Sequence, residues 1–337
     1  MDELEIRPGR LEDVAGVREF TQNTFHWGDY VADVFPDWVT QAEKGEGDVL
    51  VAVVHEGDDE KVVGVNHVRY LSPDEAWFEG IRVRPEYRRS GIGRMLTASS
   101  IGRARERGVK LCRAAIDSDN EKSQGLARSF GFRPVATIIQ LELDAAGFLG
   151  GQHDQRATER GEKTASRKDK DSQAGPPEGF SVRPATLEEV LSVYRIVSAE
   201  AVRIIGGDYT WWSVTPENVT RLVASGKMLV AVDANGAVAA GAVADEDFET
   251  EVEEGAQGVL FCEASSAFGD EAGIRAIVAH LASRVAEEAA EKELSARLTV
   301  LCEDKSTAAG LLRKMGFSET SYDGRRDEIW IWELELR

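Results

Sequence analysis

Two arginines and two glycines at close spacing form the clearest candidate for a binding site in this sequence. Arg88 and Arg89 precede Gly91 and Gly93, and the glycines open a segment whose apolar residues recur at helical spacing. The first N–H groups of a helix lack partners within it and carry a partial positive charge, and glycine has no Cβ to keep an anion away. Arginine adds paired donors that match phosphate oxygens. The pattern therefore predicts a phosphate or pyrophosphate site.

Two familiar phosphate motifs fit this stretch less well. The P-loop ends in Gly-Lys-Ser/Thr, which is missing, and the dinucleotide fingerprint needs Gly or Ala where Leu96 stands. An ordinary tight turn with surface arginines is the plain alternative. A strand that stops at Pro85 before the turn, and a helix directly after it, favour the binding site.

Glu79 is the candidate for acid–base chemistry. Side chains alternate along a strand, so Glu79, Ile81 and Val83 are expected on one face, next to the predicted site. An amine with a pKa of about 10 is protonated at neutral pH, and a carboxylate could take its proton. A buried carboxylate paired with Arg82 or Arg69 is an equally good interpretation. His67 and His26 are weaker candidates for a base.

The elements that must position these residues follow from apolar periodicity and turn residues. Strands are predicted at 4–8, 48–56, 61–71, 76–85, 109–117 and 133–143, and helices at 11–25, 26–39, after Gly93, and at 121–131. The order is β-α-α-β-β-β-α-β-α-β.

This order, with Arg88-x-x-Gly91-x-Gly93 after a Val-x-Pro strand end, resembles the GNAT N-acetyltransferase superfamily over about residues 3–144. The resemblance implies an α/β (α+β) fold with a mixed, mostly antiparallel twisted sheet and helices on both faces. It implies acetyl-CoA as co-substrate and no metal. The cofactor-binding residues that it implies are Ile81, Arg82, Val83, Arg88, Arg89, Ser90, Gly91, Ile92, Gly93, Arg94, Asn120 and Ser123.

By the same resemblance, Glu79 is the catalytic base and a backbone N–H near Arg82 or Val83 polarises the thioester. The sequence departs from the family at Ala127, where many members carry a Tyr that protonates the leaving thiolate. Water or a hydroxyl such as that of Ser123 would have to serve. Asn120 could equally be a helix N-cap. The residues expected around the acceptor are His26, Trp27, Tyr30 and Trp77, with a core role as the alternative for Tyr30.

The first half of the sequence recurs in the second half. Residues 6–14 return at 182–190, Gly-Asp-Tyr at 28–30 returns at 207–209, and Leu-Val-Ala-Val at 50–53 returns at 229–232. Residues 150–179 contain no large apolar residue, which is typical of a linker. We therefore predict an acetyltransferase domain at 1–146, a polar linker at 147–179, and a degenerate GNAT-like copy at 180–337. The copy lacks the Arg-x-x-Gly-x-Gly pattern and has Asp270 and Glu271 at its helix start.

Composition limits the classes of partner. The 337 residues include 60 acidic and 40 basic side chains, for a net charge of −20, which disfavours nucleic acid and anionic membranes. No apolar run approaches the roughly 20 residues that span a bilayer, so a cytoplasmic protein is expected. The three isolated cysteines are expected to be buried thiols.

The resemblance to the GNAT superfamily therefore implies an acetyl-CoA-dependent N-acetyltransferase that acts on a primary amine, which we expect to be a small molecule or an amino acid. A protein or peptide N-acetyltransferase is one alternative, and a non-catalytic acetyl-CoA sensor or scaffold is another. The degenerate copy is expected to narrow the acceptor cleft by packing on the first domain. Monomer and homodimer are both open.

Overall fold

The computed structural model describes residues 4–22, 24, 28–56, 59–150, 177–200, 202–207, 209–244, 248–251, 258–322 and 325–336. They form two compact units. The first unit comprises Met1–Ala136 and Ile329–Arg337, and the second comprises Thr137–Glu328. Each unit therefore takes a strand from the other half of the sequence, and the units cross the domain limits expected from the repeat. Most of the predicted linker lies outside the described residues.

The first unit is a six-stranded sheet with helices on both faces. The strands are ordered β1-β2-β3-β4-β5-β18, and β4 and β5 are its parallel pair. Its elements are β1 (Leu4–Pro8), η1 (Leu11–Asp13), α1 (Val14–Thr21), α2 (Val31–Glu43), β2 (Gly47–Glu56), β3 (Asp59–Tyr70), β4 (Glu75–Val83), η2 (Pro85–Tyr87), α3 (Ile92–Glu106), β5 (Leu111–Asp117), α4 (Glu121–Ser129) and β18 (Glu328–Glu335).

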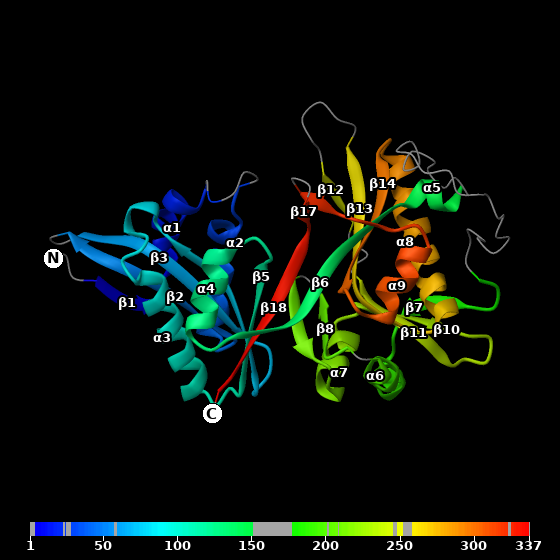
Figure 1. The fold of residues 1–337 in the computed structure, drawn as a ribbon, viewed down its shortest axis with the longest axis horizontal. Helices are drawn as coiled ribbons and strands as arrows, with labels where there is room; N and C mark the ends of the chain where they lie inside the picture. The colour runs from blue at the N-terminus through cyan, green and yellow to red at the C-terminus, as the bar shows by residue number, and fades with distance from the viewer. Residues whose placement is uncertain are drawn as a thin grey trace. The chain divides into compact units, whose positions relative to one another are not determined.

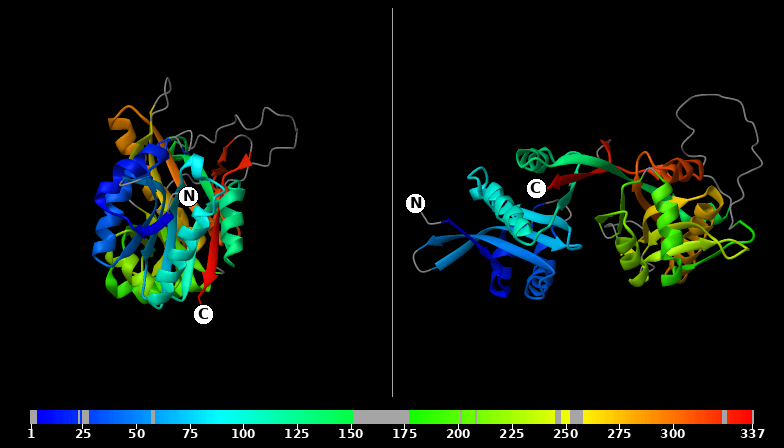
Figure 2. Two further views of the ribbon diagram at one scale, coloured as in Figure 1. Left: turned by 90° about the vertical axis from the view of Figure 1, so that its left-hand side faces the viewer. Right: turned by 90° about the horizontal axis from the view of Figure 1, so that it is seen from below.

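Alternation along β2 explains the layers of this unit. Val49, Val51 and Val53 pack with the apolar residues of α1 and α2, whereas Leu50 and Ala52 pack with Ile92 and Leu96 of α3. The right-hand view of Figure 2 shows α1 and α2 (dark blue) and α3 (cyan) on opposite faces of the sheet. A strand with apolar residues in both registers is thus buried on both sides.

Gly80 interrupts the alternation of β4. Val65 on β3 lies opposite Arg82, but His67 lies opposite Glu79, so β4 contains one extra residue at this point. Gly80 has a φ of 67°, and a Cβ there would lie 2.2 Å from Cη2 of Trp38. Only glycine fits this backbone and this contact. The bulge changes which side chains of β4 share a face.

The parallel pair separates early. β4 pairs with β5 at Glu75, Ala76 and Trp77, and within the described part of the chain no later residue of β4 has a register partner on β5. β3 continues to pair with β4 up to Val83. One edge of β4 beyond Trp77 is therefore not covered by a neighbouring strand.

The C-terminal strand completes the first unit. β18 pairs antiparallel with β5 from Ile329 to Glu335, and Figure 1 shows it (red) beside β5. Arg113 of β5 is 4% exposed and bonds Glu333 of β18 at 2.9 Å, with Glu75 of β4 at 3.6 Å. This buried charge cluster ties the last strand to the parallel pair.

The second unit repeats this architecture. Its sheet is ordered β6-β14-β13-β11-β10-β7, with β13 and β14 as the parallel pair. Its elements are β6 (Arg133–Asp144), α5 (Ala145–Leu149), β7 (Ser181–Pro184), η4 (Leu187–Glu189), α6 (Val190–Ala199), β8 (Ile204–Gly207), β9 (Thr210–Ser213), α7 (Pro216–Ala224), β10 (Met228–Val232), β11 (Val238–Ala244), β12 (Glu249–Glu251), β13 (Val259–Gly269), α8 (Glu271–Glu291), β14 (Ser295–Glu303), α9 (Thr307–Lys314), β15 (Ser318–Glu319), β16 (Ser321–Tyr322) and β17 (Arg325–Arg326).

The predicted fold class is confirmed in both units. Apolar residues of α8 pack on one face of the second sheet, and those of α6 and α7 pack on the other. One predicted boundary was wrong: the helix expected from residue 26 begins at Val31, whose N–H donates to the Asp29 carboxylate at 3.0 Å. A side-chain acceptor two residues ahead of a helix satisfies one of its unpaired N–H groups and ends the preceding loop.

Candidate functional site

The turn before α3 has the backbone shape of an anion site. Arg89 and Gly91 both adopt left-handed conformations, with φ of 67° and 89°, and no side chain caps the helix at Gly91. Arg88 is anchored by an Nε bond of 3.1 Å to the carbonyl oxygen of Val83, and Ser90 by a bond of 2.5 Å to that of Tyr87. Left-handed residues that alternate with ordinary ones turn successive N–H groups toward one point. The predicted phosphate-binding residues from Arg88 to Gly91 thus lie together in one turn.

The glycines leave room for a ligand at this turn. A Cβ at Gly91 would meet no atom within 4 Å, and one at Gly93 would lie 3.7 Å from Val83 and 3.9 Å from Ile81. The N–H groups of the first helical turn have no carbonyl partner within α3. Arg94 lies over the ring of Phe130 at 4.9 Å and bonds Ser129 at 2.9 Å. The cradle and its cationic rim fit a phosphate or pyrophosphate group.

The uncovered edge of β4 lies next to this turn. The carbonyl oxygens of Ile81 and Val83 accept bonds from the side chains of Arg82 and Arg88, both at 3.1 Å, whereas the Arg84 N–H donates to β3. The N–H and C=O of a strand residue point to the same side. The N–H groups of Ile81 and Val83 therefore face the separation between β4 and β5, and that of Arg82 faces β3.

Glu79 lies on the other face of the sheet, contrary to expectation. Its carboxylate is 2.8 Å from Nδ1 of His67, whose ring stacks on Trp38 of α2 at 4.5 Å. Ile81 and Val83 instead lie against Gly93 at the start of α3. The period-two argument was wrong here because the bulge at Gly80 inserts a residue between Glu79 and Ile81.

The arginine expected to compete for Glu79 has another partner. Arg82 bonds Asp29 at 2.6 Å, and the Asp29 side chain is fully buried. The Glu79 carboxylate is 21% exposed and bonds His67 instead. Tyr30 lies 5.9 Å from the Arg82 guanidinium and is 42% exposed, while burial of its hydroxyl and the Glu79 charge raise its pKa to about 12. The Tyr30 hydroxyl is therefore a proton donor at neutral pH.

Other predicted residues have structural roles. Asn120 accepts a bond from the Ser123 N–H at 3.1 Å and caps α4, as the alternative interpretation held. Ala127 is buried in a core cluster with Phe132 and Trp332. Trp77 is only 1% exposed, so the expectation that it lines an open acceptor site has no support in the structure. His26 and Trp27 lie outside the described residues.

Two important features were undervalued in the sequence. A glycine inside a strand pattern signals a bulge, and Gly80 could have been recognised on that ground. His67 is fully buried opposite Glu79, and only the pairing of β3 with β4 reveals this contact.

Among its described residues, the second unit has no comparable cradle before α8. Its β13 pairs with β14 as far as Ser265, and Ser266, with a φ of 53°, takes the position of Gly80 in a corresponding bulge. The Asp270 carboxylate caps α8 by accepting from Gly273 N–H at 2.7 Å, and Glu200 accepts from Gly269 N–H at 3.0 Å. Carboxylates thus occupy the donors that an anion would need, which is the physical basis of the predicted degeneracy.

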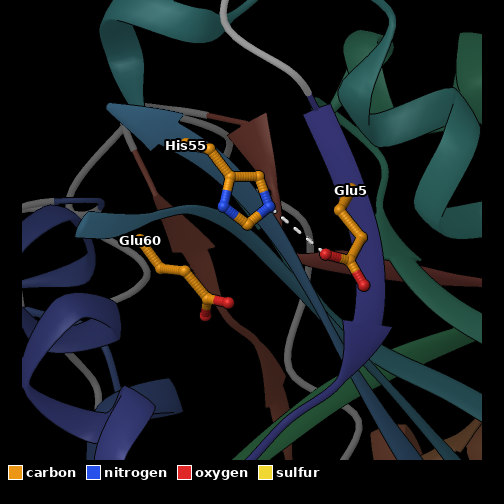
Figure 3. A group of neighbouring side chains, drawn as sticks. All are labelled: Glu5, His55 and Glu60. Atoms are coloured by element: carbon orange, nitrogen blue, oxygen red, sulfur yellow. Dashed lines mark hydrogen bonds and ion pairs between the residues drawn. The ribbon is translucent and has the colours of Figure 1, made fainter. Parts of the chain in front are cut away.

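One group of side chains has a spacing that suits a metal ion. Figure 3 shows Glu5, His55 and Glu60 on neighbouring strands, with His55 joined to Glu5 at 3.3 Å. Glu60, however, binds the Arg7 guanidinium at 2.5 and 3.1 Å. Because Arg7 already neutralises it, we assign no metal to this exposed group.

The fold is that of known acetyltransferases. A GCN5-related N-acetyltransferase from Sphaerobacter thermophilus matches with a TM-score of 0.56 and 15% identity, over 99% of this chain and 96% of that one. A tandem GNAT protein from the clavulanic acid biosynthesis pathway matches with a TM-score of 0.55 and 15% identity, over 99% and 98%. A GCN5-related N-acetyltransferase from Kribbella flavida matches with a TM-score of 0.53 and 16% identity, over 99% and 71%. No curated protein matches the sequence.

The sequence agrees with the fold. Residues 15–132 match the model of the acetyltransferase (GNAT) family. The chain thus has the fold of a tandem GNAT protein, and the part of its first unit that matches the GNAT family model includes the turn at Arg88–Gly93 and the bulged strand. Among the described residues, no helix is long and apolar enough to span a membrane.

Proposed function

We propose that the protein is an N-acetyltransferase that binds one acetyl-CoA at the first unit and transfers the acetyl group to a primary amine. Family membership of residues 15–132 implies acetyl transfer from acetyl-CoA. The observation that carries the proposal is the separation of β4 from β5 after Trp77, directly beside the uncapped turn at Gly91. An extended ligand can pair with a free strand edge while its phosphates bind the turn.

Each residue has a stated task in this proposal. The turn from Arg88 to Gly93 holds the pyrophosphate, and bound acetyl-CoA supplies an activated acyl group as a thioester. The N–H groups of Ile81 and Val83 donate to charge that develops at the edge of β4. Glu79, on the opposite face, takes the proton of the acceptor ammonium.

The acceptor that we propose is a small primary amine or amino acid. The net charge of −20 attracts cations, and partly exposed Tyr30 lies among Asp29, Glu79 and Arg82, where an aromatic ring can contact an ammonium or its apolar stem. A peptide N-terminus carries the same charge. The acceptor test therefore compares both classes: free amino acids and polyamines against short peptides, with CoA release as the readout.

Binding is tested on the full chain, because β6 and β18 are exchanged between the two units. Calorimetry should give one acetyl-CoA per chain, with an affinity that Arg88→Ala weakens and that Asp270→Ala in the second unit leaves unchanged. Two sites, or binding that survives Arg88→Ala unchanged, would contradict the proposed location.

Catalysis is tested with Glu79→Gln, which keeps shape and removes the base. Turnover should fall by roughly 10²–10⁴-fold at neutral pH and recover partly as free amine accumulates at higher pH. Glu106→Gln, an exposed change of the same charge at the end of α3, is the matched control. Tight acetyl-CoA binding without turnover of any amine would instead indicate a sensor or scaffold.

A further inference from the structure

We propose that His67 is a positioning residue that holds the Glu79 carboxylate in the orientation in which it accepts the proton of the acceptor amine. The inference rests on the proposed function and extends it to a residue on a neighbouring strand. His67 does not contact the acceptor in this proposal. It acts through a single hydrogen bond, from its Nδ1–H group to Glu79.

The geometry leaves the imidazole one arrangement. His67 is fully buried, it stacks on Trp38 with an interplanar angle of 10°, and its Nδ1 is 2.8 Å from the Glu79 carboxylate. Its Nε2 is a buried atom for which the described part of the chain offers no hydrogen-bond partner. A Cβ at Gly47 would lie 3.0 Å from this Nε2, so the backbone of β2 closes that side.

This arrangement favours one protonation state. An imidazolium would bury a second, unpaired N–H donor, whereas the neutral ring with its proton on Nδ1 leaves only a weakly solvated lone pair. Burial accordingly lowers the pKa of His67. The ring can therefore donate to the carboxylate without becoming an alternative base, and the transferred proton stays on Glu79.

The other charged groups around the pair have their own partners. Arg82 on β4 is bound to Asp29 before α2, and Asp48 on β2 is bound to Arg103 at 3.1 Å and to the Tyr70 hydroxyl. Arg69 on β3 lowers the pKa of His67, and Asp48 raises it. The Tyr30 hydroxyl is protonated at neutral pH, as that of an ordinary tyrosine is, and burial raises its pKa further, to about 12. Among these groups, the bond from His67 is the one that fixes the orientation of Glu79.

The second unit shows that the fold does not require a histidine here. His67 of β3 pairs with Glu79 just before the bulge in β4, and Val243 of β11 pairs with Ser265 just before the corresponding bulge in β13. Strand register therefore places Val243 at the position of His67 and Ser265 at the position of Glu79. The unit that has lost its anion cradle has therefore lost the carboxylate and the imidazole together. A residue needed only for packing would not have to disappear with the base.

Substitutions that differ in where they place a donor test the proposal. In His67→Asn the side-chain amide can occupy the position of Nδ1, whereas in His67→Gln it reaches toward Nε2 and in His67→Leu the donor is gone. With the best amine from the acceptor panel, we expect Asn to retain most of the kcat, and Gln and Leu to lower it about 10-fold or more, with acetyl-CoA affinity unchanged. Equal activity of all three variants, or equal loss in all three, would overturn the positioning role.

A double-mutant cycle separates this proposal from the proposed base. In the Glu79→Gln background, His67→Gln should change kcat by less than about 3-fold, because the group that it positions is already gone. Full additivity would mean that His67 acts independently of Glu79, and the inference would fail while the base remained. If Glu79→Gln alone were without effect, the proposed function of Glu79 would fail first.

A spectroscopic measurement tests the bond without turnover. The sequence has five histidines, and the imidazole ¹⁵N signals of His67 are assigned by their loss in His67→Asn. The wild-type ring should show the neutral tautomer protonated at Nδ1 at neutral pH, the form that is the less common one in water. An Nε2-protonated ring or an imidazolium would refute the proposal, even if the Leu variant failed to fold.

Discussion

Replacing Gly80 by alanine tests the feature on which the arrangement of the site depends. Gly80 has a φ of 67°, and a Cβ there would lie 2.2 Å from Cη2 and 3.0 Å from Cζ3 of Trp38. Trp38 is 4% exposed and stacks on His67, so the indole cannot move without disturbing the partner of Glu79. We therefore expect Gly80→Ala to affect both stability and activity.

The magnitude follows from two separate costs. A left-handed conformation costs a residue with a Cβ roughly 1–2 kcal/mol, and overpacking against a buried ring costs typically about 1–3 kcal/mol. The sum of roughly 2–5 kcal/mol is a large part of the stability of an ordinary domain. If the strand relaxed by giving up the bulge, Ile81 and Val83 would turn to the other face of the sheet and the proposed acetyl-CoA site would be lost.

Urea unfolding of the full chain, with acetyl-CoA calorimetry on the same samples, measures both effects. Gly108→Ala is the matched control, because Gly108 has a φ of 81° but nothing within 4 Å of its Cβ position. It should show the conformational cost alone, about 1–2 kcal/mol. If Gly80→Ala destabilised the protein no more than Gly108→Ala, the close packing of Trp38 on the bulge would be refuted.

Three further predictions follow from charged groups. Arg88→Ala should weaken acetyl-CoA binding by roughly 1.5–3 kcal/mol in calorimetry, because a charge-assisted bond to phosphate is lost. Arg105→Ala is the control. An equal loss of affinity for pantetheine without phosphates would contradict the phosphate role of Arg88. Arg113→Met should lower the free energy of unfolding by about 3–5 kcal/mol, because it leaves the buried carboxylate of Glu75 and the partly buried carboxylate of Glu333 without their cation. An unchanged thermal transition would show that this cluster does not hold β18. The Arg183 guanidinium lowers the pKa of Glu189 to about 2 from 4.5, so this ion pair stabilises the fold fully above about pH 4.5 and loses its effect as the pH falls through about 2. In chemical unfolding, the loss of stability caused by Glu189→Gln should therefore shrink as the pH falls over that range. A difference in stability that stays constant with pH would refute this linkage.

The local sequence alone predicted the turn that we propose as the anion site, and it determined the fold class. Two glycines, a preceding proline and a helical pattern specify a turn with exposed N–H groups, and these are properties of neighbouring residues that need no long-range contact. The periodicity of the apolar residues, and the turn residues between apolar segments, likewise predicted the order of strands and helices from local sequence. The recurrence of short segments at a nearly constant offset predicted a second copy of the fold.

Tertiary structure decided how the site is divided between the faces of the sheet. One extra residue in β4 reverses every side chain beyond it; Gly80 signals a bulge in the sequence, but the residue pairs across β3 and β4 establish that one residue is inserted there. Glu79 therefore meets His67, which stacks on Trp38, while Ile81 and Val83 meet the start of α3. The partner of the partly buried Glu79 carboxylate is a residue 12 positions away, which the pattern of one strand does not encode.

Tertiary structure also decided which strands belong to which unit. The predicted limits followed the sequence repeat, but β18 pairs with β5 and β6 pairs with β14. Both final strands are apolar and alternate, so either sheet offers each of them a compatible edge, and periodicity cannot distinguish the two. The choice is made by specific contacts such as Arg113 with Glu333, which join residues 220 positions apart in the chain.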